Sequence, residues 1–143
     1  MYNRVIVTLD GSVHAECALP HAESLARGLG VPLVLLQVVP YPEVRDAAVE
    51  SDWEEVARKY LEPIAERLKG EGIDARVEIL WGKVEDKIVE YAEADPDSLL
   101  VISTHGRTGL ARLAFGSVTE AVLRRVAAIP VVVCRCMRMT SAS

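Results

Sequence analysis

Five short apolar runs alternate along the chain with longer segments in which apolar residues recur every three or four positions. Short apolar runs are typical of strands, and the longer spacing is typical of amphipathic helices. The runs lie at 5–7, 31–39, 75–80, 99–102 and 131–133. Regular alternation of strand and helix predicts an α/β fold, because each helix returns the chain so that the next strand runs parallel to the last. We therefore expect an open, five-stranded parallel sheet with helices on both faces.

The helical spacing predicts helices at 14–29, 47–69, 84–92 and 118–126. Pro63 lies inside the second of these segments. A proline removes one backbone hydrogen bond and clashes with the preceding turn, so we expect a kink or a break near Glu62.

The strands differ in their pattern of polar residues. The runs at 5–7, 33–36 and 99–102 are continuously apolar, as in strands that are covered on both faces. The run at 75–80 alternates apolar and polar residues, so we expect it at an edge of the sheet with one face in solvent.

Length and charge limit the classes of function. A chain of 143 residues with 50% hydrophobic residues is expected to form one domain over 1–143, with a loose polar tail at 137–143. The net charge of −5 argues against general nucleic-acid binding, which needs a basic surface. No apolar run reaches the roughly 18 residues of a membrane helix, and the first residues resemble a strand rather than a signal peptide. We expect a cytoplasmic protein with neither nucleic-acid nor membrane partners.

The three cysteines fit no common framework. Cys17, Cys134 and Cys136 are odd in number and contain no CxxC pair, which argues against a disulfide scaffold and against a common zinc site. We expect thiols that are not joined in disulfides. Cys134 and Cys136 would share one face of a strand, which leaves open a soft-metal site or a strained disulfide between them.

Several aromatic and histidine side chains have a structural interpretation. Trp53, Tyr60 and Trp81 are expected to pack rather than to stack on bases, because no basic surface surrounds them. His14 and His21 lack the further ligands of a structural zinc site, so we expect both at the surface or in an interface.

In an open parallel sheet, ligands bind outside the carboxyl ends of the strands. The first strand leads there into Thr8, Leu9 and Asp10, followed by Gly11 and Ser12. Asp10 is a candidate ligand residue at this edge. Its alternative role is to accept backbone hydrogen bonds in the turn before Gly11.

The fourth strand leads into a longer loop that starts at Ser103 and ends at Gly116 and Ser117, where the last helix begins. Gly116 allows close approach of the backbone, and the first-turn amides of a helix offer unpaired donors to an anion. Gly106 can do the same at the other end of the loop, where Arg107 adds positive charge. The alternative is that the glycines serve a plain strand-to-helix turn, because neither Walker nor GxGxxG spacing is present.

These residues resemble a motif of the universal stress proteins of the UspA superfamily, which the chain resembles over nearly its whole length. The family's nucleotide-binding members carry Gly, two residues, Gly, nine residues, and then Gly followed by Ser or Thr. Here Gly106 is followed by nine residues and then by Gly116 and Ser117, whereas Ser103 stands at the first glycine position. Segments 8–12 and 36–39 also resemble the family's first and second strand ends. The resemblance implies a Rossmann-like, adenine-nucleotide-binding fold with strand order 3-2-1-4-5.

The resemblance also implies roles for individual residues. Asp10 would face the ribose or adenine, Val38 would line the adenine pocket, and the motif residues from Gly106 onward would wrap the phosphates. The ligand would be ATP, with AMP or ADP as alternatives and magnesium alongside. The expected ligand-binding residues are Thr8, Leu9, Asp10, Val38, Ser103, His105, Gly106, Arg107, Gly116, Ser117, Val118 and Thr119.

The Ser103 side chain would either crowd the ribose or replace a backbone contact with a hydroxyl. His105 is expected to pack in the loop, because acid–base work needs a partner that the sequence does not identify. The resemblance further implies a homodimer built through the last strand, at Val131, Val132 and Val133.

Three functions follow from this sequence. The first is a nucleotide-binding stress-response or regulatory protein with at most slow hydrolysis, because no carboxylate set for two metals and no base for activating water are evident. The alternative is an interaction module of the same fold that binds no nucleotide, which the change at Ser103 permits. The third, phosphotransfer on Asp10, lacks a second nearby carboxylate to hold magnesium.

Overall fold

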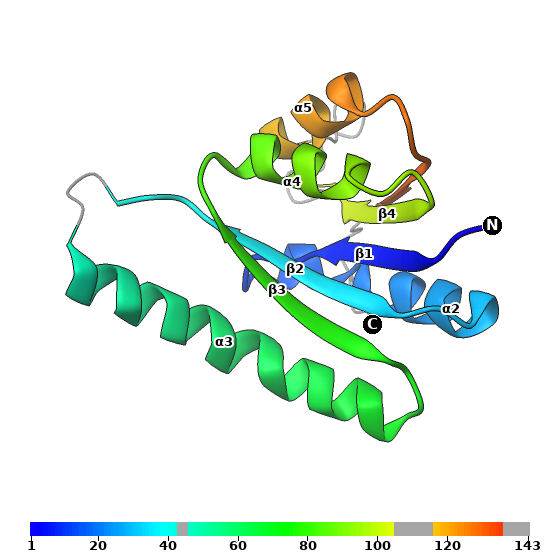
Figure 1. Ribbon diagram of the computed structural model, residues 1–143, viewed down its shortest axis with the longest axis horizontal. Coiled ribbons are helices and arrows are strands. Elements are labelled where there is room, and N and C mark those ends of the chain that lie inside the picture. Colours follow the sequence, from blue (N-terminus) through cyan, green and yellow to red (C-terminus); the bar gives the residue numbers. More distant parts are fainter. Residues whose placement is uncertain (43–45, 105–115, 136–143) are drawn as a thin grey trace, which may run out of the picture.

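The structure is a computed structural model that describes residues 1–42, 46–104 and 116–135. Its five strands form one parallel sheet in the order β3-β2-β1-β4-β5 (Figure 1). This confirms the expected α/β class and strand order. The strands are β1 (Arg4–Thr8), β2 (Leu33–Val39), β3 (Ala75–Trp81), β4 (Ser98–Ser103) and β5 (Val131–Cys134). The helices are α1 (Val13–Glu16), α2 (Leu19–Leu29), α3 (Ala47–Gly70), α4 (Val84–Glu93) and α5 (Ser117–Arg125).

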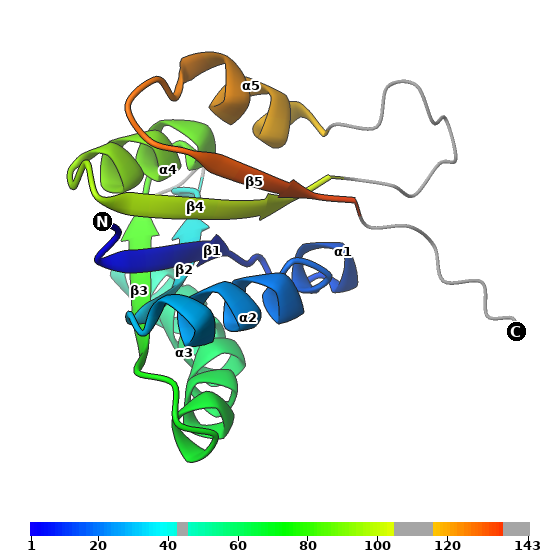
Figure 2. The ribbon, with the colours of Figure 1, turned by 90° about the vertical axis from the view of Figure 1, so that its right-hand side faces the viewer.

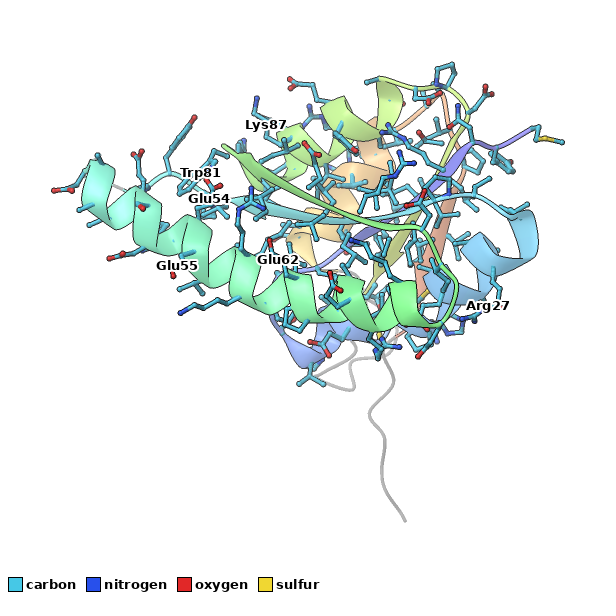
Figure 3. All side chains as sticks on the ribbon, turned by 60° about the horizontal axis from the view of Figure 1, so that its bottom comes forward. Arg27, Glu54, Glu55, Glu62, Trp81 and Lys87 are labelled. Carbon is cyan, nitrogen blue, oxygen red and sulfur yellow. The ribbon has the colours of Figure 1, made fainter. Side chains whose placement is uncertain are left out.

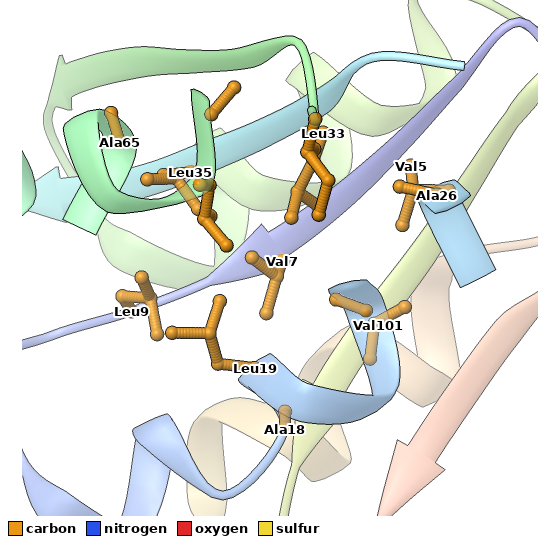
Figure 4. Packing of buried hydrophobic residues seen from close by; sticks show 14 of the residues in the cluster. Val5, Val7, Leu9, Ala18, Leu19, Ala26, Leu33, Leu35, Ala65 and Val101 are labelled. Carbon is orange, nitrogen blue, oxygen red and sulfur yellow. The ribbon is translucent and has the colours of Figure 1, made fainter. Parts of the chain in front are cut away.

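Helices cover both faces of the sheet, as Figure 2 shows, with α4 and α5 on one side and α1, α2 and α3 on the other. Alternate side chains of each strand divide between two apolar clusters. Val5, Val7 and Leu35 pack with α2 and α3, as the close view of this cluster shows (Figure 4). Ile6 and Leu36 pack with α4 and α5 on the opposite face. The continuous apolar runs of β1, β2 and β4 follow from this double coverage.

The helix expected at 14–29 is wrong as one element, since the chain forms α1 and α2 with Cys17 and Ala18 between them. Both intervening N–H groups bond to carbonyls three residues back, Cys17 to His14 and Ala18 to Ala15. Pro20 lies in the first turn of α2, where the backbone N–H has no helical acceptor and its absence costs nothing. In the interior of a helix, the proline ring would clash with the preceding turn. The apolar spacing continues across this point and so concealed the new helix start.

Of the kink or break expected near Glu62, the break does not occur, because α3 continues through Pro63 to Gly70 (Figure 1). A proline at this position leaves the carbonyl of Lys59, four residues earlier, without its helical donor. Both Pro63 and Lys59 are exposed, so water can bind that carbonyl. The solvent face of a long helix therefore tolerates the proline.

The two edge strands of the sheet differ in composition. The prediction that the third strand lies at an edge is confirmed, and β3 carries the charged residues Arg76 and Glu78. β5 forms the other edge, where Val131, Val132 and Val133 are half-buried and no residue is charged. Only the β3 edge has the charges that discourage the pairing of further strands.

Cys17 and Cys134 are not joined in a disulfide within the described residues. Cys136 and the tail expected at 137–143 lie outside those residues. Among the described helices, none has both the length and the apolar character needed to span a membrane.

Candidate functional site

A cleft of about 580 Å³ lies at the carboxyl edge of the sheet. This volume is in the range of small-molecule sites. Residues from β1, β2, β4 and four helices contribute to its lining. The cleft brings together seven of the residues predicted from the sequence, namely Thr8, Leu9, Asp10, Val38, Ser103, Val118 and Thr119.

The turn after β1 positions Asp10 at the cleft. Gly11 takes a φ of 88°, a left-handed conformation that favours glycine. The Ser12 amide donates to Asp10 Oδ1 over 2.8 Å, and Ser12 Oγ accepts from the Ala15 amide over 3.1 Å at the start of α1. Asp10 therefore has the turn role that was the alternative to ligand binding. It is also exposed and lines the cleft, so the turn role leaves it accessible to a ligand.

The end of β4 and the start of α5 form one side of the cleft, which we call the polar wall. It consists of Ser103, Thr119 and the first turn of α5. Thr119 Oγ1 donates to the Ser103 carbonyl over 2.7 Å, which fixes the helix start against the strand end. The first-turn N–H groups of a helix have no intrahelical acceptor and favour an anion.

Gly116 is the N-cap of α5, with a φ of −72° and a ψ of 167°. Any residue adopts this extended conformation, so the backbone turn does not by itself require glycine here. The alternative interpretation, in which the motif glycines only make a turn, is therefore weakened at Gly116. Ser117 is exposed in the first turn of α5. His105, Gly106 and Arg107 lie outside the described residues.

The opposite side of the cleft is formed by β2 and α3, and we call it the apolar wall. Val38, Trp53 and Val56 line it. Trp53 is 39% exposed and Val56 is 67% exposed, which gives the cleft flat and aliphatic contact surfaces. Trp53 was expected to be a packing residue, and instead it lines the cleft. His14, expected at the surface or in an interface, is half-buried in the lining.

Sequence reasoning missed the contributions of α3 and α4 to this cleft. A signal for α3 was present, because Val49, Trp53, Val56 and Tyr60 follow helical spacing on a stripe beside the buried one. Such a second apolar stripe indicates a surface that the core does not use. The inward residues of α4 at the cleft, Val84 and Ile88, have no comparable signal.

The other predicted packing aromatics lie outside the cleft. Trp81 stacks on Tyr41 with ring centroids 5.8 Å apart, and its Nε1 donates to Glu54 over 3.4 Å; Figure 3 shows Trp81 and Glu54 next to each other. The Tyr60 hydroxyl donates to Glu16 over 2.7 Å. Burial, reinforced by the Glu16 carboxylate, raises the pKa of Tyr60 far above its usual value, so its proton stays in place.

The described residues contain no cluster of three or more His, Cys, Asp or Glu side chains that could hold a metal ion. Asp10 is the acidic residue in the described lining of the cleft. One carboxylate suits magnesium only when substrate phosphates supply other ligands. The donor set therefore fits a metal that arrives with a nucleotide, rather than a metal held by protein ligands alone.

Comparison with known proteins identifies the family. A model of the universal stress protein family matches residues 1–135. The chain belongs to this family. A universal stress protein of Methanocaldococcus jannaschii, MJ0531, is 30% identical over 131 residues, which span 87% of this chain and 77% of that protein.

Solved structures show the same fold. The structure of MJ0577, whose curated sequence is a universal stress protein of M. jannaschii, matches with a TM-score of 0.81 and 27% identity over 99% of both chains. A universal stress protein from Archaeoglobus fulgidus, solved in complex with dAMP, matches with a TM-score of 0.65 and 25% identity, over 93% of this chain and 97% of that one. An adenine nucleotide thus binds to a relative of this protein.

Proposed function

We propose that this protein binds an adenine nucleotide in the cleft and acts in stress response or regulation through the bound nucleotide. The observation that carries the proposal is the meeting of seven predicted ligand residues in one cleft of about 580 Å³. They come from chain segments that are up to 111 positions apart, between Thr8 and Thr119. The dAMP complex of the A. fulgidus relative supports the choice of an adenine nucleotide.

The two walls suit the two ends of such a ligand. The apolar wall offers Val38, Trp53 and Val56 to the flat base, and the polar wall offers helix amides to the phosphates. We propose ATP as the ligand, with AMP and ADP as alternatives. Magnesium would bind to the phosphates and screen their charge, and Asp10 would face the ribose or adenine. Hydrolysis is expected to be slow at most, because the described lining holds a single carboxylate, Asp10, and so no carboxylate set for two metals.

The proposal is tested by thermal unfolding of the whole chain with ATP, ADP or AMP, each with and without magnesium. A ligand that binds only the folded state at a hundredfold excess over its Kd adds about 2.7 kcal/mol to the free energy of unfolding. We expect the melting temperature to rise by several degrees with at least one nucleotide. Absence of any rise at millimolar nucleotide and magnesium would favour the alternative, an interaction module that binds no nucleotide.

We also infer a homodimer formed through β5, in the cytoplasm. The support is the uncharged edge, where Val131, Val132 and Val133 are only half-buried. An uncovered apolar edge strand favours pairing with another strand. Light scattering at micromolar concentration should give twice the chain mass of 15.6 kDa. The variant Val132→Lys should shift the mass toward the monomer, and a monomeric wild type would exclude this dimer.

A further inference from the structure

One polar side chain interrupts the apolar sequence of β2. Gln37 follows Leu36 in the strand sequence LVLLQVV, and β2 lies between β3 and β1 inside the sheet. Burying a polar group costs free energy unless it is hydrogen-bonded. All the remaining residues of this interior strand are apolar. Packing therefore gives no reason for an amide at this point.

The Gln37 amide is not satisfied by the described part of the chain. Its Oε1 atom is buried and has no hydrogen-bond partner among those residues. Such orphaned acceptors are rare in folded proteins, and a bound ligand is one of the explanations for them. Thr104 Oγ1 is also buried without a partner among the described residues, but it adjoins residues 105–115, which the structure does not describe.

The place of Gln37 in the sheet puts it at the cleft. Gln37 pairs with Ile79 of β3 on one side. On its other side β1 ends, since the Leu9 amide makes its bond to the Leu36 carbonyl over 2.8 Å and the chain then turns at Asp10. Gln37 lines the cleft together with Trp53 of the apolar wall. The unsatisfied amide is therefore on the side of the cleft that suits a base.

We propose that Gln37 reads the base of the bound nucleotide and makes the cleft selective for adenine. A carboxamide carries a donor and an acceptor side by side, and it can pair with the 6-amino group of adenine and the neighbouring ring nitrogen at the same time. The side chains of Val38 and Val56 cannot make these bonds, and the Trp53 indole offers a donor only. This inference deepens the proposed function and rests on it.

The test compares two ligands on two proteins. The ligands are AMP and purine riboside 5′-monophosphate, which is AMP without the 6-amino group. The proteins are the full-length wild type and Gln37→Leu, and the measurement is Kd by calorimetry. We expect loss of the amino group to weaken binding to the wild type by about tenfold, as for loss of a hydrogen bond that leaves a buried partner unsatisfied. In Gln37→Leu the two ligands should bind within about twofold of each other, because the partner of the amino group is gone.

Stability separates a reading role from a structural one. If the Gln37 amide binds the nucleotide and makes no stabilising bond in the free protein, Gln37→Leu without nucleotide should unfold at the same temperature as the wild type or higher. The reason is that an unsatisfied polar group has been replaced by an apolar one. Gln37→Met, whose side chain has similar length and no branch, should repeat both results. It provides a second measurement if leucine packs poorly.

Each outcome decides a separate question. An equal loss of affinity for the two ligands in both variants would show that Gln37 supports the cleft by packing, and would overturn this inference. Full retention of the tenfold preference in both variants would overturn it too. Failure of the wild type to bind AMP, ADP or ATP would instead remove the proposed function.

Discussion

The two walls of the cleft are held in place by different means. The polar wall depends on a hydrogen bond, since Thr119 donates to the Ser103 carbonyl. At the other end of α5, Glu93 of α4 accepts from the amides of Ala127 and Ala128. The apolar wall depends on α3, whose buried residues pack on the sheet while its cleft residues Trp53 and Val56 stay partly in solvent.

This difference separates binding from stability. On α3, the side chains offered to a ligand, Trp53 and Val56, are distinct from those that pack in the core, so they can change with little cost to folding. On the polar wall, the same helix start serves the ligand and the fold. Variants on the two walls should therefore differ in how loss of affinity and loss of stability are related.

The largest effect is expected from Gly116→Val at the start of α5. Its φ and ψ suit valine, but the branched side chain would stand where the phosphates approach. We expect at least about tenfold weaker binding of ATP and ADP by calorimetry. The change at the N-cap should cost up to about 1 kcal/mol of stability.

Gly28→Val is the matched control, because a Cβ at Gly28 would meet no heavy atom within 4 Å and Gly28 lies in α2, which, unlike α5, contributes no residue to the described lining of the cleft. It should leave affinity unchanged and should not lower stability, because valine has a higher helix propensity than glycine and the added side chain enters open space. Equal affinity losses in the two variants would show that the loss at Gly116 is not specific to the start of α5.

On the apolar wall, Trp53→Ala should weaken binding of adenosine and ATP by the same factor, about fivefold, because loss of a ring contact of about 1 kcal/mol is independent of the phosphates. The melting temperature should change little, since Trp53 is 39% exposed. Val49→Ala is the control, one turn earlier on α3, 37% exposed and outside the described lining. A loss confined to ATP would show that Trp53 faces the phosphates.

A smaller effect is expected from Thr119→Val, which keeps the shape of the side chain and removes its hydroxyl. The Ser103 carbonyl would lose its 2.7 Å bond, so unfolding in urea should show a loss of about 1 kcal/mol. Affinity should fall together with stability, because the start of α5 loosens. An unchanged urea midpoint would show that the hydroxyl does not anchor the polar wall.

The smallest effect is expected from Glu93→Gln, measured as the change in the free energy of unfolding with pH. The amides of Ala128 and Ala127 hold the pKa of the Glu93 carboxylate below its ordinary value of 4.5. A lowered pKa in the folded state adds stability that is present above pH 4.5 and is lost as the pH falls through the folded value. The variant should be slightly less stable at neutral pH and show a shallower loss in acid.

Glu90→Gln is the control for that measurement, because Glu90 is exposed on the same helix and forms an ion pair with Lys87, one turn earlier. It should leave the acid limb of the stability curve close to that of the wild type. If both variants reduce the pH dependence of stability equally, the cause is the loss of one negative charge and not the link between α4 and α5.

Strand positions and sheet order were predictable because they depend on local apolar patterns and on family resemblance. The errors arose where one local rule competes with another. At Pro20 the apolar spacing continued across a helix boundary, and Pro63 lies on the exposed face of α3, where water can reach the carbonyl that the proline leaves without a donor. Neither outcome follows from spacing alone, because both depend on which face of the helix meets water.

The site was predictable where residues follow directly after strands. Asp10 and Ser103 follow from the rule that ligands bind at the carboxyl edge of the sheet. Trp53 and Val56 could not be placed in the same way, because their approach to the cleft depends on how α3 packs across the sheet. Gln37 was missed because an isolated glutamine in a strand carries no motif, and its significance appears only when its acceptor is found without a partner among the described residues.

The unequal edges of the sheet also bear on the size of any assembly. If two copies join through β5, each one uses its uncharged edge, and the outward edges of the joined sheet are then both β3. Those edges carry Arg76 and Glu78, which oppose the addition of another strand. Growth by sheet extension would end at two copies, since a symmetric contact of one patch with itself closes the assembly. The charge pattern of a single strand would thus prevent the formation of a fibre.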